Sequence, residues 1–355
     1  MCRIIALVLL LVSAALAPVS VGAGTLVVAN KSEATVSLVD TGSGEILATL
    51  PTGNAPHEVA VSPNGMLALV GNYGTRDEPG SSLTVIDVGT AKVVKTIELK
   101  EYTHPHGIAW LNDEVALVTA EDHQALLRIN ITNGKVEQKI STNAEISHMV
   151  SVARNHGLAF VSNIGSGSVT VIDLALGILV ANVPTAEGAE GIAVTPDGRQ
   201  VWVTNRAANT ISVLNATGRK VIAQIEAGEF PIRAEATADG RFVLVTNAKG
   251  NDLSVFSIAE MKEIGRVSFT QVSKGDDGRL FSDRFGDSSV PIGIEIVDSE
   301  KRAYVAHANA DDISIIDLNE GKVVGTLSAG KEPDGMGWSP LTPTGEVSEE
   351  ETPES

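Results

Sequence analysis

Short runs in which apolar residues alternate with small or polar residues follow one another along most of the chain. Typical runs are "TVSLVD", "VWVTN" and "TISVLN", and Gly, Asn-Gly or Pro-Asp-Gly turn signals stand between them. Alternation with a period of two predicts half-buried β-strands, and the turn residues predict tight connections between the strands. The frequent Val, Ile, Thr, Ser and Gly suit this interpretation better than they suit helices.

Four such runs form a unit that returns seven times, with a spacing of about 42 residues. Two of the copies are "LAFVSNIGSGSVTVIDLALGILVANV" and "VWVTNRAANTISVLNATGRKVIAQI". A fixed four-strand unit of this length is typical of a propeller blade, which buries its faces against its neighbours. The sequence therefore predicts an all-β, seven-bladed β-propeller with four-stranded blades over residues 24–340.

The phase of the repeat predicts how the ring closes. The first repeat phrase, "TLVVAN", corresponds to the second strand of a unit, and the last one, "PDGMGWSP", corresponds to a first strand. We therefore expect the strand from Asp334 to Ser339 to join the N-terminal three strands, Thr25 to Leu50, in one composite blade.

The phrases "GIAVTPDGRQVWVTN" and "TISVLNATGRKVIAQIEAGEFP" resemble the YVTN-type repeats of the YncE-like β-propeller superfamily, whose members are exported bacterial and archaeal proteins. The resemblance covers residues 25–340 and implies the propeller fold. It implies no single function, because the superfamily includes quinoprotein-associated periplasmic proteins, surface-layer proteins, lactonase-like enzymes and binding proteins.

The two ends of the chain differ from the repeats. Residues 1–23 carry Arg3, an apolar run and a small-residue site ending at Ala23, which predicts a secretory signal peptide. The apolar run is shorter than a membrane span requires. Cys2 is the only cysteine and lies in this segment, so we expect no disulfide in the mature protein. Residues 341–355 form a polar, acidic tail that we expect to be disordered.

The second residue of each predicted innermost strand should stand at the mouth of the central channel. Aligned copies place Asp, His, His, His and Glu on five consecutive blades, and apolar residues on the other two. The seven residues, in ring order, are Asp334, His57, His106, His148, Glu190, Ile232 and Ile292.

Three imidazoles with flanking carboxylates form a ligand set for Zn, Mn, Fe or Cu. We therefore consider His57, His106 and His148 as ligands of a divalent transition metal, while the cofactor itself stays unknown. Two alternatives stay open: these histidines bind a ligand without metal, or they are inherited with the repeat and only bond neighbouring loops.

Other unusual residues lie in the opposite sector of the ring. Arg233 replaces the Gly or Glu that follows the mouth residue, and Glu235 and Glu295 occupy a column of small residues. Two neighbouring buried carboxylates repel unless they are protonated, paired or bound to a cation. A buried bridge from Arg233 is the interpretation we favour, and acid–base chemistry is the alternative. His307 replaces the Asn of "VTN" and is a further candidate contact.

Two insertions should reach the same mouth. The longer one runs from Thr270 to Val290, where Phe281, Arg284 and Phe285 could form a lid and Asp276, Asp277 and Asp283 could hold calcium. The shorter one is "YGTRDEPGSS", from Tyr73 to Ser82.

Formal charge disfavours two classes of partner. The chain carries a net charge of −18, which disfavours binding to nucleic acid or to anionic lipid. We expect a monomeric periplasmic or secreted protein, without a membrane span after signal cleavage. It would bind a small molecule or a periplasmic protein partner at the channel mouth, in an accessory role linked to quinoprotein-type oxidation as the resemblance implies. The alternative is a metal-dependent lyase, hydrolase or oxidase that uses the three histidines.

Overall fold

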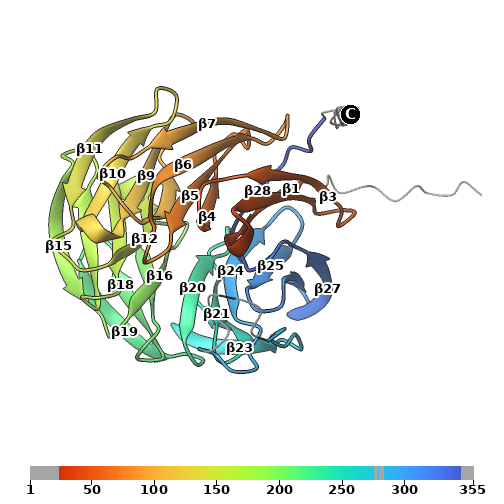
Figure 1. Ribbon diagram of the computed structural model, residues 1–355. Helices are drawn as coiled ribbons and strands as arrows, with labels where there is room; N and C mark the ends of the chain where they lie inside the picture. Colours follow the sequence, from red (N-terminus) through yellow and green to blue (C-terminus); the bar gives the residue numbers. More distant parts are fainter. Residues whose placement is uncertain (1–23, 276–278, 280–283, 345–355) are drawn as a thin grey trace, which may run out of the picture.

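The computed structural model describes residues 24–275, 279 and 284–344. The predicted signal peptide, most of the predicted acidic tail, Phe281 and the three aspartates of the longer insertion lie outside the described residues. The described residues form seven four-stranded antiparallel sheets arranged as blades around a central axis (Figure 1). The sequence prediction of an all-β, seven-bladed propeller is confirmed.

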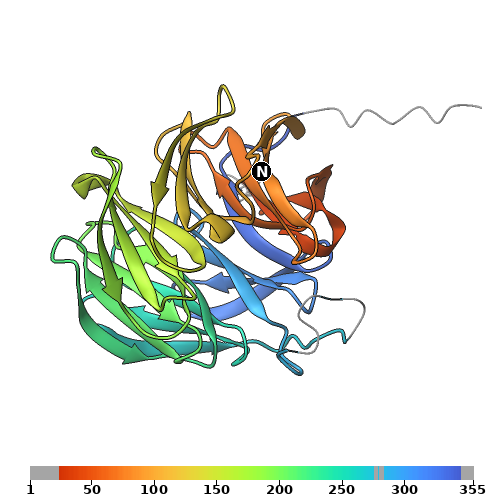
Figure 2. The same cartoon turned by 60° about the vertical axis from the view of Figure 1, so that its left-hand side comes forward.

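The first blade is the composite one, and its strand order is β28-β1-β2-β3. Its strands are β28 (Pro333–Ser339), β1 (Thr25–Asn30), β2 (Thr35–Asp40) and β3 (Ile46–Pro51). Trp338 pairs with Leu26 and Gly337 with Val27, so the last strand closes the ring on the first. Figure 2 shows the same closure, with blue and red strands in contact. The predicted closure is confirmed.

The other six blades follow in chain order, each with its first strand innermost. The second blade holds β4 (Pro56–Val61), β5 (Leu67–Gly74), β6 (Pro79–Asp87) and β7 (Lys92–Glu98). The third holds β8 (Pro105–Trp110), β9 (Val115–Ala120), β10 (Ala125–Asn130) and β11 (Lys135–Ser141). The fourth holds β12 (Ser147–Ala153), β13 (Leu158–Asn163), β14 (Ser168–Asp173) and β15 (Ile178–Pro184).

The fifth blade holds β16 (Ala189–Val194), β17 (Gln200–Asn205), β18 (Thr210–Asn215) and β19 (Lys220–Glu226). The sixth holds β20 (Pro231–Ala236), β21 (Phe242–Asn247), β22 (Asp252–Ser257) and β23 (Lys262–Ser268). The seventh holds β24 (Pro291–Val297), β25 (Arg302–His307), β26 (Asp312–Asp317) and β27 (Lys322–Ser328). Three short 3₁₀ turns, Lys31–Glu33, Glu121–His123 and Arg154–His156, are the helical elements of the described residues, and none is long enough to cross a membrane.

The "VTN" phrase of the repeat has a separate role for each residue. In β17 the Val203 side chain is buried in the core between blades. The Thr204 hydroxyl donates to the carbonyl oxygen of Ile232 on the next inner strand, at 3.3 Å. The Asn205 amide donates to Thr210 and Ser212 on the third strand, at 3.1 and 3.0 Å. One phrase thus ties a strand to its own blade and to the neighbouring blade.

Glycines at the third position of the inner strands allow neighbouring blades to approach closely. A Cβ atom on Gly335 would lie 2.6 Å from the carbonyl oxygen of His57, and one on Gly107 would lie 2.6 Å from that of His148. Contacts shorter than 3.0 Å to backbone are not tolerated without a shift of the strands. The close packing of the inner strands at the axis therefore depends on these glycines.

We predict that Gly335→Ala lowers the free energy of unfolding by about 2–3 kcal/mol, because the added methyl group forces β28 away from β4. Urea unfolding followed by tryptophan fluorescence measures this change. Gly265→Ala is the matched control, since a Cβ atom at Gly265 on the outer strand β23 would meet nothing within 4 Å. Equal stability of the two variants would contradict the prediction.

Candidate functional site

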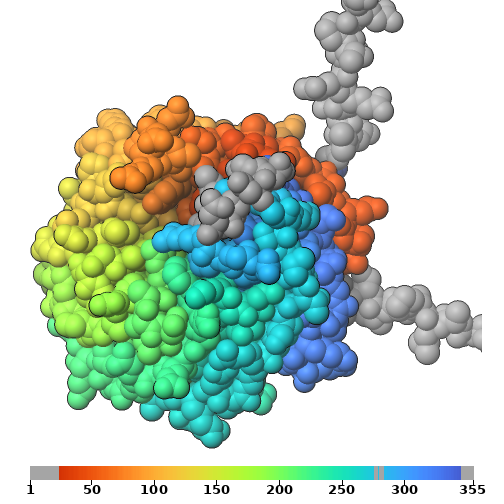
Figure 3. Space-filling model, turned by 60° about the horizontal axis from the view of Figure 1, so that its bottom comes forward, coloured from red at the N-terminus to blue at the C-terminus, as the bar shows by residue number. Residues whose placement is uncertain are grey.

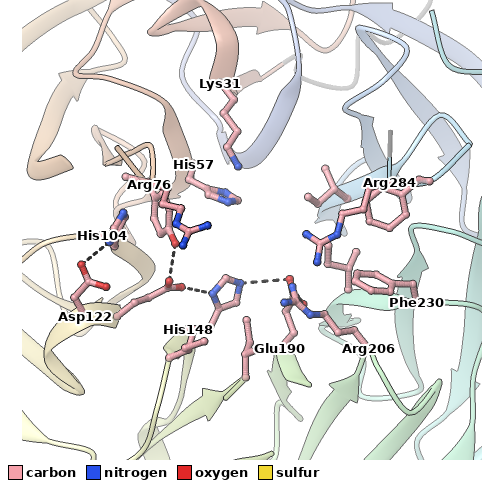
Figure 4. Close-up of a pocket in the computed structure, with 17 residues that line it drawn as sticks. Lys31, His57, Arg76, His104, Asp122, His148, Glu190, Arg206, Phe230 and Arg284 are labelled. Carbon is pink, nitrogen blue, oxygen red and sulfur yellow. Dashed lines mark hydrogen bonds and ion pairs between the residues drawn. The ribbon is translucent and has the colours of Figure 1, made fainter. Parts of the chain in front are cut away.

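A cavity of about 440 Å³ opens at one end of the central channel (Figure 4). The predicted mouth residues occupy the second position of all seven inner strands. His57, His148, Glu190, Ile232 and Ile292 line the cavity directly. His106 and Asp334 are fully buried in the same ring. The inner strands contact one another in the order β28, β4, β8, β12, β16, β20 and β24, so the polar residues occupy neighbouring positions.

A second set of lining residues was not anticipated from the sequence, apart from Tyr73, which begins the shorter insertion. These residues directly follow the "VTN" position of their blades, and they are Lys31, Tyr73, Glu121, Ile164 and Arg206. The signal that reveals them is the repeat itself, because the same column holds Ala248 and Ala308 in the two remaining blades. This column varies between charged, aromatic and small residues, although the repeat around it is regular. Such variation indicates that the fold does not determine which residue stands there.

The turns that lead into the inner strands supply a third set. In each of the seven turns, the residue two positions before the mouth residue has a positive φ. His104, Ile146 and Phe230 are three of these residues, with φ values of 51°, 54° and 58°, and their side chains line the cavity. This left-handed conformation is unfavourable for residues other than glycine. It turns these side chains toward the mouth in several blades.

Both insertions reach the mouth, as the sequence predicted for the loops. Arg76 comes from the shorter insertion, and Arg284 and Phe285 come from the longer one. In Figure 4 the side chain of Arg284 extends into the cavity from the side opposite His57 and Arg76. Figure 3 shows light-blue atoms, which belong to this part of the chain, over the middle of the ring.

The three histidines form a contiguous row. The ring centroids of His57 and His106 are 4.2 Å apart, and those of His106 and His148 are 3.6 Å apart. His106 is fully buried, and neither of its nitrogens has a hydrogen-bond partner in the described part of the chain. Burial, together with the neighbouring His148 and His57, holds the pKa of His106 well below its usual value. His106 is therefore a neutral imidazole at neutral pH.

The two outer histidines of the row are each held by a carboxylate. His57 Nδ1 lies 2.9 Å from Asp334 Oδ2, and His148 Nδ1 is hydrogen-bonded to Glu121. Burial lowers the pKa of His57 although Asp334 opposes the shift. Burial also acts against charge on His148, but Glu121 and Glu190 outweigh it and raise the pKa of His148. His106, at the centre of the row, is thus neutral, and His148, at one end, favours the protonated form.

Glu190 connects the row to the arginines. Its Oε2 lies 2.6 Å from Arg206 Nη1, and its Oε1 lies 3.4 Å from His148 Nε2. Burial alone would raise the pKa of Glu190, but Arg206, His148 and Arg233 lower it to about 2. Glu190 is therefore an anion that is already balanced by its neighbours.

Arg233 pairs across the axis, and this corrects the bridge expected from the sequence. Its Nε lies 3.0 Å from Glu58 Oε1 on the opposite side of the ring, and its Nη1 lies 3.5 Å from Glu190. The expected bridge from Arg233 to Glu235 and Glu295 is wrong. The alignment of repeats places Arg233 and Glu58 in the same column, but it does not show that the arginine side chain extends across the ring to the blade of Glu58.

Glu235 and Glu295 face a second cavity of about 220 Å³ inside the channel, which Glu58 and Arg233 also line. Their carboxylates accept backbone hydrogen bonds, from Ile296 N at 3.0 Å and from Trp338 N at 3.1 Å. Burial and the neighbouring carboxylate raise the pKa of Glu235 well above its usual value, and burial raises that of Glu295 to about 7. The pair therefore retains protons at pH values at which a free carboxylic acid is ionised.

His307 lies away from the mouth cavity. Its Nδ1 is 2.7 Å from Ser289 Oγ and its Nε2 is 2.8 Å from Ser314 Oγ, and the residue is fully buried. Burial lowers its pKa to about 3. Both nitrogens are thus occupied within the blade, in the way that the Asn of "VTN" is occupied elsewhere. This geometry gives His307 a role in blade structure and offers no atom to a ligand.

We predict that Glu295→Gln alters the pH dependence of stability. The folded protein retains the Glu295 proton to higher pH than the unfolded chain does, so the free energy of unfolding falls as pH rises from about 4.5 to about 7. The variant should lose this decrease and exceed the wild type by about 1–3 kcal/mol at pH 8. Urea unfolding between pH 5 and 8 measures the difference.

The exposed Glu226 provides the control, and Glu226→Gln should keep the wild-type pH profile. A Glu295→Gln variant that keeps the wild-type slope would show that the carboxyl group is ionised in the folded protein at neutral pH.

The fold and this site define a β-propeller with a cavity at its channel mouth. Residues 110–339 match the model of the cytochrome D1 heme domain family, and the chain belongs to this family. His57 and His106 lie outside the matched residues.

Two solved structures share the fold. One is the crystal structure of a functionally unknown protein from Desulfotomaculum acetoxidans DSM 771, with 17% identity and a TM-score of 0.72 over 90% of this chain and 99% of that chain. The other is hydrazine synthase from Kuenenia stuttgartiensis, with 15% identity and a TM-score of 0.65 over 80% of this chain and 90% of that chain. No curated protein matches the chain.

Proposed function

We propose that the protein binds an anionic small molecule with a partly apolar body at the channel mouth. The observation that carries this proposal is the cationic lining of the cavity in a chain whose net charge is −18. The cations come from four different blades or loops, and they are Lys31, Arg76, Arg206 and Arg284. Apolar side chains line the same cavity, namely Ile146, Ile164, Phe230, Ile232, Phe285 and Ile292.

The acidic residues of the lining do not cancel this preference, because each has a partner within the protein. Glu190 is paired with Arg206 at 2.6 Å, and Asp122 Oδ2 lies 2.6 Å from His104 Nδ1. Glu121 accepts from Tyr73 and bonds His148. Arg76 and Arg284 are exposed and form no ion pair with a described residue. Two guanidinium groups thus remain for a carboxylate or another oxyanion.

The name of the family implies a haem, and the residues of the mouth can be compared with what a haem requires. A macrocycle takes its axial ligands from opposite faces, and a single imidazole serves each face. Here three imidazoles contact one another along one wall of the cavity, so at most one would reach an iron. A haem would leave His106 unexplained. As a set, the three histidines do not fit a haem, and we derive no chemistry through one.

The proposal includes the biological setting that the sequence indicates. We infer a YncE-like accessory protein that is exported to the periplasm or secreted as a monomer, with a link to quinoprotein-type oxidation. The leader-like composition of residues 1–23 and the YVTN-type repeats support this setting. An N-terminal sequence of the protein purified from an exporting host would test it, with a mature end near residue 24 as the expected result.

We predict that benzene-1,3,5-tricarboxylate, used as a probe, binds the mouth and that the double variant Arg76→Gln/Arg284→Gln weakens binding by at least tenfold. The physical reason is the loss of charge-assisted hydrogen bonds, each worth about 1.5 kcal/mol or more. Isothermal titration calorimetry at low salt measures the affinity, and raising the salt should lower it.

Two controls define the result. Arg199→Gln removes a guanidinium that is 80% exposed and does not line the cavity, so it should leave the affinity unchanged. The uncharged benzene-1,3,5-tricarboxamide should not bind. Equal affinity for the two probes, or an unchanged affinity in the double variant, would overturn the proposed function.

A further inference from the structure

We propose that His57, His106 and His148 bind one divalent transition-metal ion at the base of the mouth cavity. The inference deepens the proposed function, because the ion would lie beside the cationic lining and an anionic ligand would complete its coordination. Metal binding itself is measurable without that ligand, so the two proposals fail separately.

His106 provides the strongest observation. It is 0% exposed, and both ring nitrogens lack a hydrogen-bond partner among the described residues. A buried polar group without a partner lowers the stability of the fold by about 1–3 kcal/mol. If the residue at this position had only a structural role, an apolar side chain would stabilise the fold more than histidine does. The position does accept apolar residues, since Ile232 and Ile292 occupy the same column in two other blades. A metal ion would satisfy the free nitrogen.

The two flanking histidines are already oriented as ligands usually are. Metal-binding imidazoles commonly use their second nitrogen to contact a carboxylate, which fixes the ring orientation. His57 Nδ1 lies 2.9 Å from Asp334, and His148 Nδ1 is bonded to Glu121. The Nε2 atom of His57 therefore remains for an ion, whereas that of His148 lies 3.4 Å from Glu190 Oε1 and would have to exchange this contact for the ion. Of these two carboxylates, Asp334 belongs to the arc predicted from the sequence, whereas Glu121 does not.

Distances between the ligand atoms place each flanking histidine close to His106. One nitrogen each of His57 and His106 lies within 4.8 Å of the other and of a Glu58 oxygen. The same limit holds for His106, Glu121 and His148. His106 belongs to both groups and no group holds all three histidines within this limit, so the ion would lie against His106 and a flanking ring would have to move to complete the three-nitrogen site. Glu58 is already paired with Arg233, which leaves the imidazoles as the main donors.

The donor set selects the kind of ion. Imidazole nitrogen suits Zn²⁺, Co²⁺, Fe²⁺ and Cu²⁺, whereas Ca²⁺ and Mg²⁺ prefer oxygen ligands. Three protein ligands also leave one position open, as in catalytic zinc sites. In this structure that position would face the cavity lined by Lys31, Arg206 and Arg284. An ion there would polarise a bound oxyanion or activate water, which is the chemistry of the metal-dependent lyase, hydrolase or oxidase considered from the sequence.

The experiment uses the untagged full-length protein, stripped with a chelator and titrated with Zn²⁺ and with Co²⁺. We expect one ion per chain by elemental analysis after dialysis, a higher melting temperature with Zn²⁺, and a Co²⁺ absorption spectrum typical of nitrogen coordination. Calorimetric titration should give an affinity that His106→Ala weakens at least a hundredfold. The exposed His156 provides the matched control, and His156→Ala should bind as the wild type does.

His57→Ala and His148→Ala keep the test decisive if His106→Ala does not fold, because each should also weaken Co²⁺ binding. Three results would overturn the proposal: no stoichiometric ion and no shift in melting temperature, binding that is unchanged in a folded His106→Ala variant, or a haem absorption spectrum in the purified protein with no other metal. If the protein bound the tricarboxylate but no metal ion, this proposal would fail and the proposed function would stand.

Discussion

The close approach of neighbouring inner strands at the axis is the constraint on which the rest of the molecule depends. Glycine at the third position of several inner strands lets the next strand pack against its backbone, and Gly107 and Gly335 show this most directly. Hydroxyl groups of the second strands then bond the same backbone, as when Thr119 Oγ1 donates to the carbonyl oxygen of His148 at 2.6 Å. The contact of His106 with His148 follows from it, because Gly107 allows β12 to lie that close to β8.

The same close approach of the inner strands brings charged groups together that water would otherwise separate. Isolated buried charges are unfavourable, and each one here has a counterpart. Arg233 reaches Glu58 across the axis, Glu190 lies against Arg206, and Lys31 lies 3.3 Å from Asp334. Glu235 and Glu295 form no ion pair with a described residue, and protonation takes the place of a counter-charge. The carboxylates of the mouth are therefore neutralised by neighbouring groups, while the arginines that face solvent can still pair with an anion.

The repeat made the fold and the mouth column predictable from the sequence, because every copy repeats the same strand and the same position within it. His57, His106, His148, Glu190 and Asp334 lie at equivalent positions for that reason. Contacts across the ring were not predictable in this way. An alignment of repeats places Arg233 and Glu58 in one column, but it does not say that a long side chain spans the axis between opposite blades.

The residues after "VTN" were missed for a different reason. Lys31, Glu121 and Arg206 look like ordinary turn residues, since a charged residue after a strand is common on any surface. Only the direction of the turn, set by the closed ring, brings them over the cavity. His307 shows the opposite error: an unusual residue in a regular column was expected to contact a ligand, yet two serine hydroxyls, Ser289 and Ser314, satisfy it inside the blade.

The contrast between His307 and His106 gives the strongest argument about the site. Both are fully buried histidines at the mouth end of their strands. The chain surrounds His307 with two hydroxyl groups that satisfy its nitrogens, whereas it surrounds His106 with two further imidazoles whose own Nδ1 atoms face carboxylates. A fold that satisfies one buried imidazole so fully has the means to satisfy another. The contrast therefore supports the proposed metal ion at His106.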